Sequence, residues 1–375
     1  MSEHTRRQFI RSAGSVAATT VLAPEALAAG RAAPTRGRSE AVAAQAAPST
    51  YYTYQSEIYV NGMVVGVPPK ITTNLSKLEA QAAKVLGREA REHLLASAGG
   101  RSVARANARA FRGWRIIPRM FRDHERRDLS TRILGIRMPA PVILAPVGRQ
   151  RLAHDEGELA SARAAAGLEL PYVISAGASF SVEDVATANG TGARWYALDW
   201  PNDDDLSRLR RAASAGCTHL LLAPSRSGRG WEQLRRIRRA WDGPILLTGV
   251  QTVADAKAAA RRRFDGIVVS NHRGRRGGGP PGSVDVLPAI ADAVGRQLSV
   301  LCESGVRTGP EAFKALALGA DAVLVGRPYV YGLALEGAAG VTHVMRTMLA
   351  EFDLTLAGAG YRSHRELGRA SLARA

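Results

Sequence analysis

The sequence predicts an α/β protein: a (β/α)₈ TIM barrel that follows an N-terminal helical preface. From position 141 onward, eight short apolar runs alternate with helix-like stretches, which is the pattern of a parallel sheet with crossover helices. The starts of these runs lie about 20 to 33 residues apart, close to one βα unit each. Because eight such units close a barrel, we assign the barrel to residues 141–365.

The predicted barrel strands share a run of four or five mostly apolar residues. They are 142–145, 172–175, 194–198, 219–222, 245–248, 266–269, 299–302 and 322–325. An open doubly wound sheet is the alternative architecture, but no GxGxxG motif follows the first run to support it.

The segment before the barrel, residues 51–140, is predicted to be a helical preface. Leu75, Leu78, Ala82, Val85 and Leu86 recur at helical spacing, and a second helix is expected over 90–95. Residues 29–50 are rich in Ala, Arg, Pro and Ser without apolar periodicity, which predicts a flexible linker.

The first 28 residues carry the features of a twin-arginine signal peptide. Arg6 and Arg7 precede Phe9 and a modest apolar run, and Ala26-Leu27-Ala28 offers a small-residue cleavage site. The apolar run is too short to span a membrane, so no stable membrane insertion is expected. We therefore expect export to the periplasm or the extracellular space, with residues 1–28 outside the fold.

The composition argues against two other classes of protein. The net charge of +18 could indicate a nucleic-acid partner, but aromatic residues make up only 6% of the chain and none interleave with the arginine runs. We therefore expect a small-molecule partner and no nucleic acid. Cys217 and Cys302 form no CxxC or Cys/His cluster, so neither a disulfide framework nor a metal site is predicted.

The loop after the sixth run contains the first candidate catalytic residues. In a barrel the chemistry gathers where the strands end and the βα loops begin. There, the sequence SNHRGRRGGG places His272 and Arg275 in a glycine-rich loop. A histidine can accept a proton at neutral pH, and an arginine can hold a carboxylate with two parallel hydrogen bonds.

The loops after the seventh and eighth runs predict a phosphate site. Such barrels often bind phosphate there, through backbone N–H groups exposed by glycine and through an arginine. The first loop, which begins Glu303-Ser304, supplies Gly305 and Arg307, and the second supplies Gly326 and Arg327.

Four stretches of sequence resemble the FMN-dependent α-hydroxy-acid oxidases and dehydrogenases. They are FRGWRIIPR at 111–119, LAPVGRQRLAHDEGELASARAAA from Leu144, SNHRGR from Ser270 and FKALALGADAVLVGRP from Phe313. The resemblance runs from about Gln55 to Arg362. Within that family, the segment QSEIYVNG at 55–62 is more similar to the lactate 2-monooxygenase-like branch.

The resemblance implies FMN as cofactor, oxidation of a 2-hydroxy acid by hydride transfer to the flavin, and a homo-oligomer, often a tetramer. It makes His272 the base and Arg275 the carboxylate clamp. It places the phosphate on Gly305, Arg307, Gly326 and Arg327. The remaining implied cofactor contacts are Pro146, Val147, Gly148, Ser175, Thr248, Ser270, Glu303 and Ser304.

Several positions depart from the family pattern. Thr248 replaces a lysine beside the flavin, so the flavin loses a neighbouring positive charge. Leu94 and Asp199 replace tyrosines, Ala223 replaces the aspartate that orients the histidine, and Gly230 replaces a second carboxylate-binding arginine. The long lid after the fourth strand is also missing, because 224–230 leads almost directly into a helix containing Trp231 and Leu234.

These departures leave two hypotheses for the function. The first is an exported FMN-dependent oxidoreductase that acts on a 2-hydroxy acid or a larger related molecule. The second is a catalytically impaired barrel that binds FMN or another ligand without redox activity. The sequence does not identify the substrate or the electron acceptor.

Overall fold

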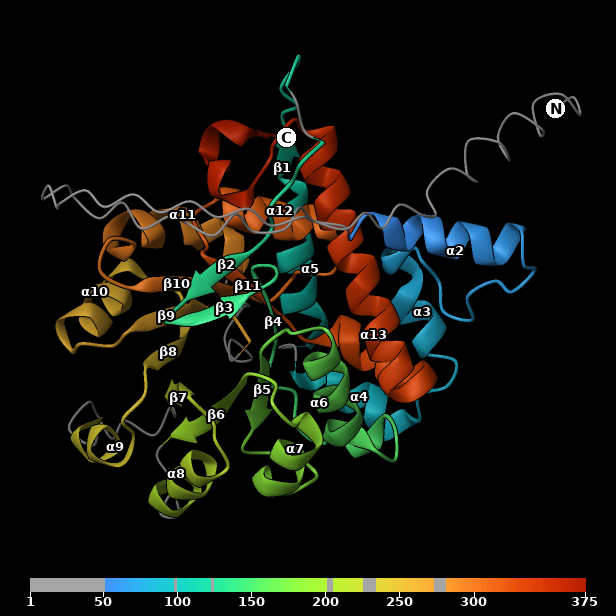
Figure 1. Ribbon diagram of the computed structural model, residues 1–375. Helices are drawn as coiled ribbons and strands as arrows, with labels where there is room; N and C mark the ends of the chain where they lie inside the picture. The colour runs from blue at the N-terminus through green and yellow to red at the C-terminus, as the bar shows by residue number, and fades with distance from the viewer. Residues whose placement is uncertain (1–50, 98–99, 123–124, 201–204, 225–233, 273–280) are drawn as a thin grey trace, which may run out of the picture. The chain divides into compact units, whose positions relative to one another are not determined.

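The computed structural model describes residues 51–97, 100–122, 125–200, 205–224, 234–272 and 281–375. The predicted signal peptide and linker lie outside these residues. The fold prediction is confirmed: eight parallel strands form a closed barrel in the order β4-β5-β6-β7-β8-β9-β10-β11, which closes through pairing of β11 with β4. Figure 1 shows helices arranged around the strands.

All eight predicted barrel strands are present. They are β4 Val142–Leu144, β5 Tyr172–Ser175, β6 Arg194–Trp200, β7 His219–Pro224, β8 Ile245–Val250, β9 Gly266–Val269, β10 Ser299–Glu303 and β11 Ala322–Val325. Strands β6, β7 and β8 run two residues further than predicted, toward the end where the site lies. A register shift between Thr248 and Val250 marks a bulge in β8 beside β9, as is common next to active sites.

The crossover helices follow the strands in turn. They are α6 Gly157–Gly167, α7 Val182–Asn189, α8 Asp205–Ser214, α9 Leu234–Ala240, α10 Val253–Arg261, α11 Ser283–Val294, α12 Gly309–Ala317 and α13 Arg327–Gly358. Side-chain caps define several starts: the hydroxyls of Ser181 and Thr252 each accept the N–H of the third helical residue. Helix α13 bends at Glu336 and Gly337, where the backbone leaves helical geometry.

The barrel has an inner and an outer apolar layer, as expected when side chains alternate along each strand. Inward-facing residues from the strands form a small buried cluster that includes Trp195, Leu246 and Leu301. The hairpin of β2 Thr131–Ile133 and β3 Ile136–Met138 contributes Ile133 and Met138 to this cluster. The hairpin therefore closes the end of the barrel where the strands begin, and the opposite end is left for the site.

The preface is helical only up to Arg112. It comprises α2 Thr53–Met63, the 3₁₀ turn η1 Leu75–Lys77, α3 Leu78–Ala82, α4 Arg88–Ser97 and α5 Gly100–Arg112. The helical spacing predicted a helix through position 86, but α3 ends at Ala82 and Val85 is exposed. After α5 the chain forms β1 Trp114–Ile116, which pairs antiparallel with the C-terminal strand β12 Leu372–Arg374.

A buried ion pair joins the preface to the barrel. The Arg127 guanidinium donates to the Asp353 carboxylate in α13, and both side chains are almost completely buried. The backbone N–H of Tyr52 donates to the other oxygen of the same carboxylate at 3.1 Å. Asp353 thus fixes the entry of the preface against the last helix.

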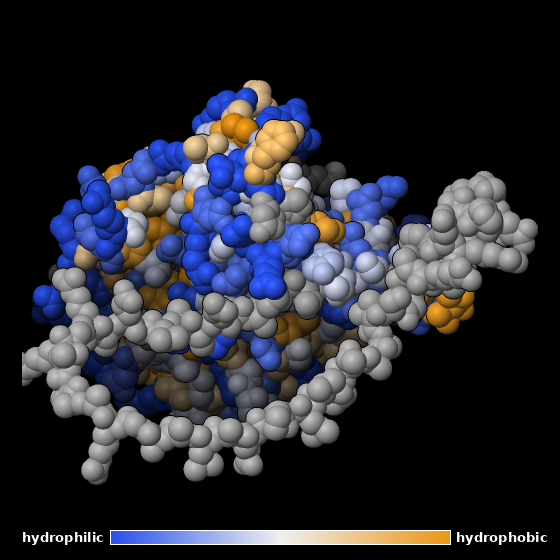
Figure 2. Space-filling view, turned by 45° about the horizontal axis from the view of Figure 1, so that its top comes forward, coloured by the Kyte–Doolittle hydropathy of each residue, from blue (hydrophilic) through white to orange (hydrophobic). Residues whose placement is uncertain are grey.

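The visible surface is mixed in polarity. Figure 2 shows hydrophilic residues over much of the molecule, with hydrophobic residues in separate patches between them. Within the part of the chain that the structure describes, no helix combines the length and the apolarity needed to cross a bilayer.

Candidate functional site

A cavity of about 320 Å³ opens at the carboxyl ends of the barrel strands. Almost all of the predicted site residues line it. They are Pro146, Val147, Gly148, Ser175, Thr248, Ser270, His272, Glu303, Ser304, Gly305, Arg307, Gly326 and Arg327. Arg275, the predicted carboxylate clamp, lies outside the described residues. The structure therefore brings together, from six strand ends, side chains up to 181 positions apart in the sequence.

The loop after β4 forms one wall of the cavity from backbone and small side chains. Gly148 is required there, because a Cβ at this position would lie 2.6 Å from the carbonyl oxygen of Gly177. Arg149 adopts a left-handed φ of 55°, and its N–H donates to the same carbonyl oxygen at 3.0 Å. The loops after β4 and β5 are thus held in direct contact.

A buried hydrogen-bond network supports this wall from behind. The Gln150 side-chain amide donates to the Val147 carbonyl oxygen at 2.8 Å and to the hydroxyl of Tyr172 at 2.9 Å. The Tyr329 hydroxyl donates to the Ala145 carbonyl oxygen at 2.8 Å. Carbonyl groups on both sides of Pro146 are therefore fixed by side chains of the core, which makes the wall rigid.

The opposite end of the cavity is built to hold an anion. Ser304 and Gly305 both have positive φ, of 80° and 102°, and a Cβ at Gly305 would lie 2.8 Å from the Phe111 ring. A positive φ is unfavourable for a residue other than glycine, and such strained conformations are typical of functional loops. Beside them, α13 begins at Arg327 directly after Gly326, so the positive end of a helix dipole faces this region.

Arg307 and Arg327 add two positive charges at the same place. Burial and, after it, repulsion by Arg327 lower the pKa of Arg307 to about 10. The Arg307 guanidinium donates to the backbone carbonyl oxygen of Val306 at 2.8 Å. Two neighbouring guanidinium groups at a cavity wall are unfavourable in the absence of an anion, so this end is suited to a phosphate.

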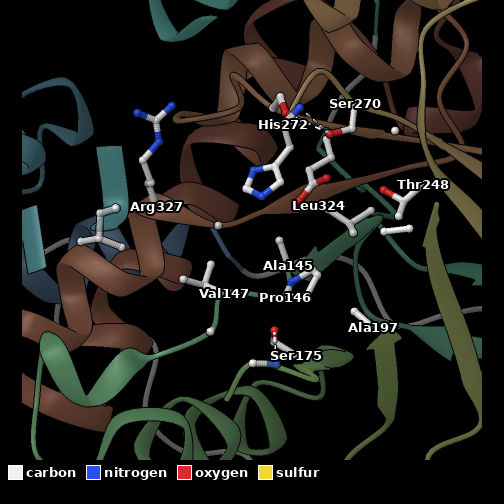
Figure 3. Close-up of a pocket in the computed structure, with 18 of the residues that line it drawn as sticks. Ala145, Pro146, Val147, Ser175, Ala197, Thr248, Ser270, His272, Leu324 and Arg327 are labelled. Atoms are coloured by element: carbon white, nitrogen blue, oxygen red, sulfur yellow. Dashed lines mark hydrogen bonds between the residues drawn. The ribbon is translucent and has the colours of Figure 1, made fainter. Parts of the chain in front are cut away.

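His272 lies at the centre of the cavity. Figure 3 shows its imidazole pointing into the open space toward Ala145 and Pro146. Its backbone N–H donates to the Ser270 hydroxyl at 3.2 Å, and that hydroxyl lies 3.2 Å from the hydroxyl of Ser304. The loop after β9, which contains His272, and the loop after β10, which contains Gly305, are therefore linked through two serines.

The substituted positions also lie at this cavity. Leu94, Asp199, Ala223 and Thr248 all line it. Parallel pairing of β6 with β7 sets Asp199 beside Ala223. Gly230 and residues 225–233 of the shortened lid lie outside the described residues. The departures read from the sequence thus concern the site itself and not a remote surface.

Three cavity residues with polar side chains were missed by the sequence analysis. His93, next to Leu94 in α4, places its Nε2 3.0 Å from the Gly148 carbonyl oxygen. Arg149 pairs with Glu89 at 2.6 Å. Asn107 lies in α5 between buried apolar residues. A polar side chain on an apolar helix face is the feature of the sequence from which it could have been predicted.

Comparison with known proteins gives a consistent result. The family model for FMN-dependent dehydrogenases matches residues 82–224 and 223–374. An FMN-dependent alpha-hydroxy acid dehydrogenase of Schizosaccharomyces pombe is 37% identical over 372 residues, covering 81% of this chain and 91% of the relative. An L-lactate oxidase of Lysinibacillus sphaericus is 35% identical over 327 residues, covering 72% of this chain and 85% of the relative.

Solved structures of mandelate oxidase share the architecture. The structure with benzoyl-formic acid superposes with a TM-score of 0.73 at 33% identity, and the match covers 81% of this chain and 98% of that one. The structure with (S)-4-hydroxymandelic acid gives a TM-score of 0.73 at 31% identity, covering 81% and 99%.

Proposed function

The chain belongs to the FMN-dependent dehydrogenase family, and we propose that it oxidises 2-hydroxy acids whose side chain is larger than that of lactate. It is an FMN-dependent α-hydroxy-acid oxidase or dehydrogenase, an oxidoreductase acting on CH–OH groups. One observation carries the substrate proposal: the histidine and the anion end are present, whereas small or apolar side chains stand at Leu94, Ala223 and Thr248.

The described residues fit FMN. The anion end offers two guanidinium groups, the first residues of α13 and a loop with two positive-φ residues. The wall of Pro146, Val147 and Gly148 presents backbone to the cavity, and a Cβ at Gly148 would collide with the facing loop. A volume of about 320 Å³ lies within the range of small-molecule sites. We propose that Arg307 and Arg327 hold the phosphate and that the wall, Ser175, Thr248 and Ser270 contact the rest of the cofactor.

The chemistry divides between cofactor and protein. Bound FMN supplies the hydride acceptor. We propose that an imidazole nitrogen of His272 accepts the proton of the substrate 2-hydroxyl group, and that Arg275 holds the carboxylate by two parallel hydrogen bonds. The rigid wall and the loops after β9 and β10 would hold the substrate and the cofactor in one relative position, and such positioning supplies much of an enzyme's rate.

The side chains at the substituted positions favour a larger substrate. Leu94 offers no hydroxyl to a carboxylate, and Ala223 offers no carboxylate to orient a protonated histidine. A small acid such as lactate would therefore be held at too few points. A larger side chain adds apolar contacts at the mouth, as the aromatic acids named with the mandelate oxidase structures would.

Steady-state kinetics test this proposal. We expect kcat/KM for mandelate to exceed that for lactate, with lactate turnover well below the usual enzymatic range of about 1 to 10³ per second. Lactate turnover within that range would contradict our interpretation of the substituted positions. Absence of turnover with every 2-hydroxy acid would instead favour the impaired, ligand-binding alternative.

The assignment to the lactate 2-monooxygenase-like branch is a further proposal, and it rests on the QSEIYVNG segment at 55–62. A monooxygenase incorporates an oxygen atom of O₂ into its product. Turnover under ¹⁸O₂ with mass analysis of the product tests this directly. An unlabelled 2-oxo acid as the sole product would place the protein with the oxidases or dehydrogenases.

We also propose that residues 1–28 are a twin-arginine signal peptide, that 29–50 are a linker, and that the protein functions in the periplasm or outside the cell. Arg6, Arg7 and the Ala26–Ala28 site support the proposal. Replacing both arginines by lysine should retain the uncleaved chain in the cytoplasm. Cleavage and export that continue unchanged in this variant would contradict the assignment.

A homotetramer is the last part of the proposal. The preface offers apolar surface for assembly: Met63, Val64 and Val65 at the end of α2 are 63–76% exposed. Such exposure is unusual for a contiguous apolar segment of a monomer. Sedimentation equilibrium should give about four times the chain mass, and a monomer at micromolar concentration would contradict it.

A further inference from the structure

We propose that Asn107 and Asn271 form an amide clamp that positions His272, so that a helix of the preface controls the catalytic base. The two side chains come from α5 and from the residue immediately before His272. The inference rests on the proposed role of His272. It assigns Asn107 and Asn271 as positioning residues, since they act through the histidine and not on the substrate.

The two amides are paired reciprocally in a buried environment. Asn107 Nδ2 donates to Asn271 Oδ1 at 2.8 Å, and Asn271 Nδ2 donates to Asn107 Oδ1 at 3.0 Å. The side chains are only 2% and 1% exposed. Buried amide pairs of this kind are geometrically specific, because breaking one leaves an unsatisfied polar group without water to replace its partner.

The same two amides bind the chain on the far side of the loop that contains His272. Asn271 Nδ2 also donates to the Pro281 carbonyl oxygen at 2.9 Å, and the Ser283 N–H donates to Asn107 Oδ1 at 2.9 Å. Asn271 precedes the loop, whereas Pro281 and Ser283 follow it. The clamp therefore ties together the two points at which the loop leaves and rejoins the barrel.

Asn107 also contacts the loop after β10. A Cβ at Gly305 would lie 2.9 Å from the Asn107 Cβ, so any residue other than glycine at position 305 would collide with Asn107. His272 is linked to the same loop through Ser270 and Ser304. His272 and the loop of the anion end are therefore both connected to Asn107 in α5.

Two roles for Asn107 can be separated by mutation. Its Oδ1 satisfies the first N–H of α11, which would be a purely structural cap. Asn271→Ala leaves that cap in place but removes both the pairing with Asn107 and the bond to Pro281. A structural cap therefore predicts normal kcat in Asn271→Ala, whereas the clamp predicts a loss.

The experiment compares Asn107→Ala, Asn271→Ala and the double variant as FMN-loaded proteins with a 2-hydroxy acid that the wild type oxidises. We expect each single variant to lower kcat about ten- to a hundredfold, because small displacements of a catalytic group have effects of this size. In Asn271→Ala, FMN affinity should change less than about twofold, since the arginines of the anion end and the contact of Asn107 with Gly305 are untouched. The double variant should lose less than the product of the two single losses, because both single variants remove the same Asn107–Asn271 pair.

Asn189→Ala is the matched control. Asn189 is also buried, and its amide donates to the Ala162 carbonyl oxygen in α6, away from the cavity residues. It should lower stability and leave kcat unchanged. Wild-type kcat in Asn271→Ala, or an equal loss of kcat in Asn189→Ala, would overturn the clamp.

A second readout separates failure of the clamp from failure of the proposed function. Amide hydrogen exchange of His272, measured in the FMN-loaded protein without substrate, should accelerate at least tenfold in Asn271→Ala and not in Asn189→Ala. If the wild type oxidises no 2-hydroxy acid, the proposed function fails and this measurement alone decides the clamp. Unchanged exchange at His272 in Asn271→Ala would then refute it.

Discussion

Replacement of Arg307 by alanine should weaken FMN binding and at the same time stabilise the cofactor-free protein. The guanidinium lies at the anion end with Arg327, and it donates to the Val306 carbonyl oxygen at 2.8 Å. The two effects have opposite signs because the same charge that attracts a phosphate is unfavourable without one.

The general strength of charge-assisted hydrogen bonds gives the size of the first effect, and the lowered pKa of Arg307 gives the size of the second. A charge-assisted hydrogen bond to phosphate contributes about 1.5 to 3 kcal/mol, which corresponds to an FMN affinity about ten- to a hundredfold weaker in Arg307→Ala. In the cofactor-free protein, burial and then Arg327 lower the pKa of Arg307 to about 10. That lowering is equivalent to about 3 kcal/mol of unfavourable charge energy, and it sets the upper limit for the gain in stability.

Fluorescence titration of the cofactor-free protein with FMN measures the first effect, and urea unfolding measures the second. Arg346→Ala is the control, since Arg346 pairs with Glu57 on the surface and should change neither quantity by more than about 1 kcal/mol. Unchanged FMN affinity in Arg307→Ala would refute the assignment of the phosphate. A stability loss of several kcal/mol in the cofactor-free protein would refute the charge argument.

Three further predictions concern the scaffold and the loop. Arg127→Met should cost about 3 to 5 kcal/mol in urea unfolding, because it leaves the buried carboxylate of Asp353 without its cation; a cost below 1 kcal/mol would contradict this. Burial, and then Arg365, lower the pKa of His364 from 6.5 to about 4. The unfolded chain therefore binds a proton that the folded one does not, and stability should fall by up to about 3 kcal/mol as pH drops from 6.5 to 4; a His364→Gln variant with the same acid dependence would argue against this cause. Gly305→Ala should abolish tight FMN binding because its Cβ would meet Phe111, whereas Gly87→Ala, in open space, should leave binding normal; equal affinities would contradict the close approach.

The barrel could be predicted because its strands are buried on both faces. Runs such as 266–269 and 322–325 are continuous apolar segments, and their spacing fixes the number of βα units. The two-stranded sheet of β1 and β12 could not be predicted in this way. β1 and β12 are each three residues long and pair across more than 250 positions. The local sequence pattern of either strand therefore does not indicate its partner.

The part of the site that lies at the strand ends could be predicted, whereas the part that comes from the preface could not. His272, Arg307 and Arg327 follow strand ends, and the barrel rule selects that position whatever the rest of the chain does. His93 and Asn107 reach the cavity from preface helices, whose packing against the barrel is a tertiary fact that local periodicity does not encode. Asn107 alone left a signal, since it interrupts an apolar helix face formed by Val103, Ala110 and Phe111.

Anaerobic reduction of the bound flavin tests the central claim most directly. The purified protein, loaded with FMN, is mixed with excess mandelate or lactate in the absence of oxygen, and the visible flavin absorbance is followed. We predict bleaching with mandelate, much slower bleaching with lactate, and none on the same timescale in His272→Ala, although this variant should bind FMN normally. Bleaching of His272→Ala at the wild-type rate, or equally fast bleaching by lactate, would contradict the account.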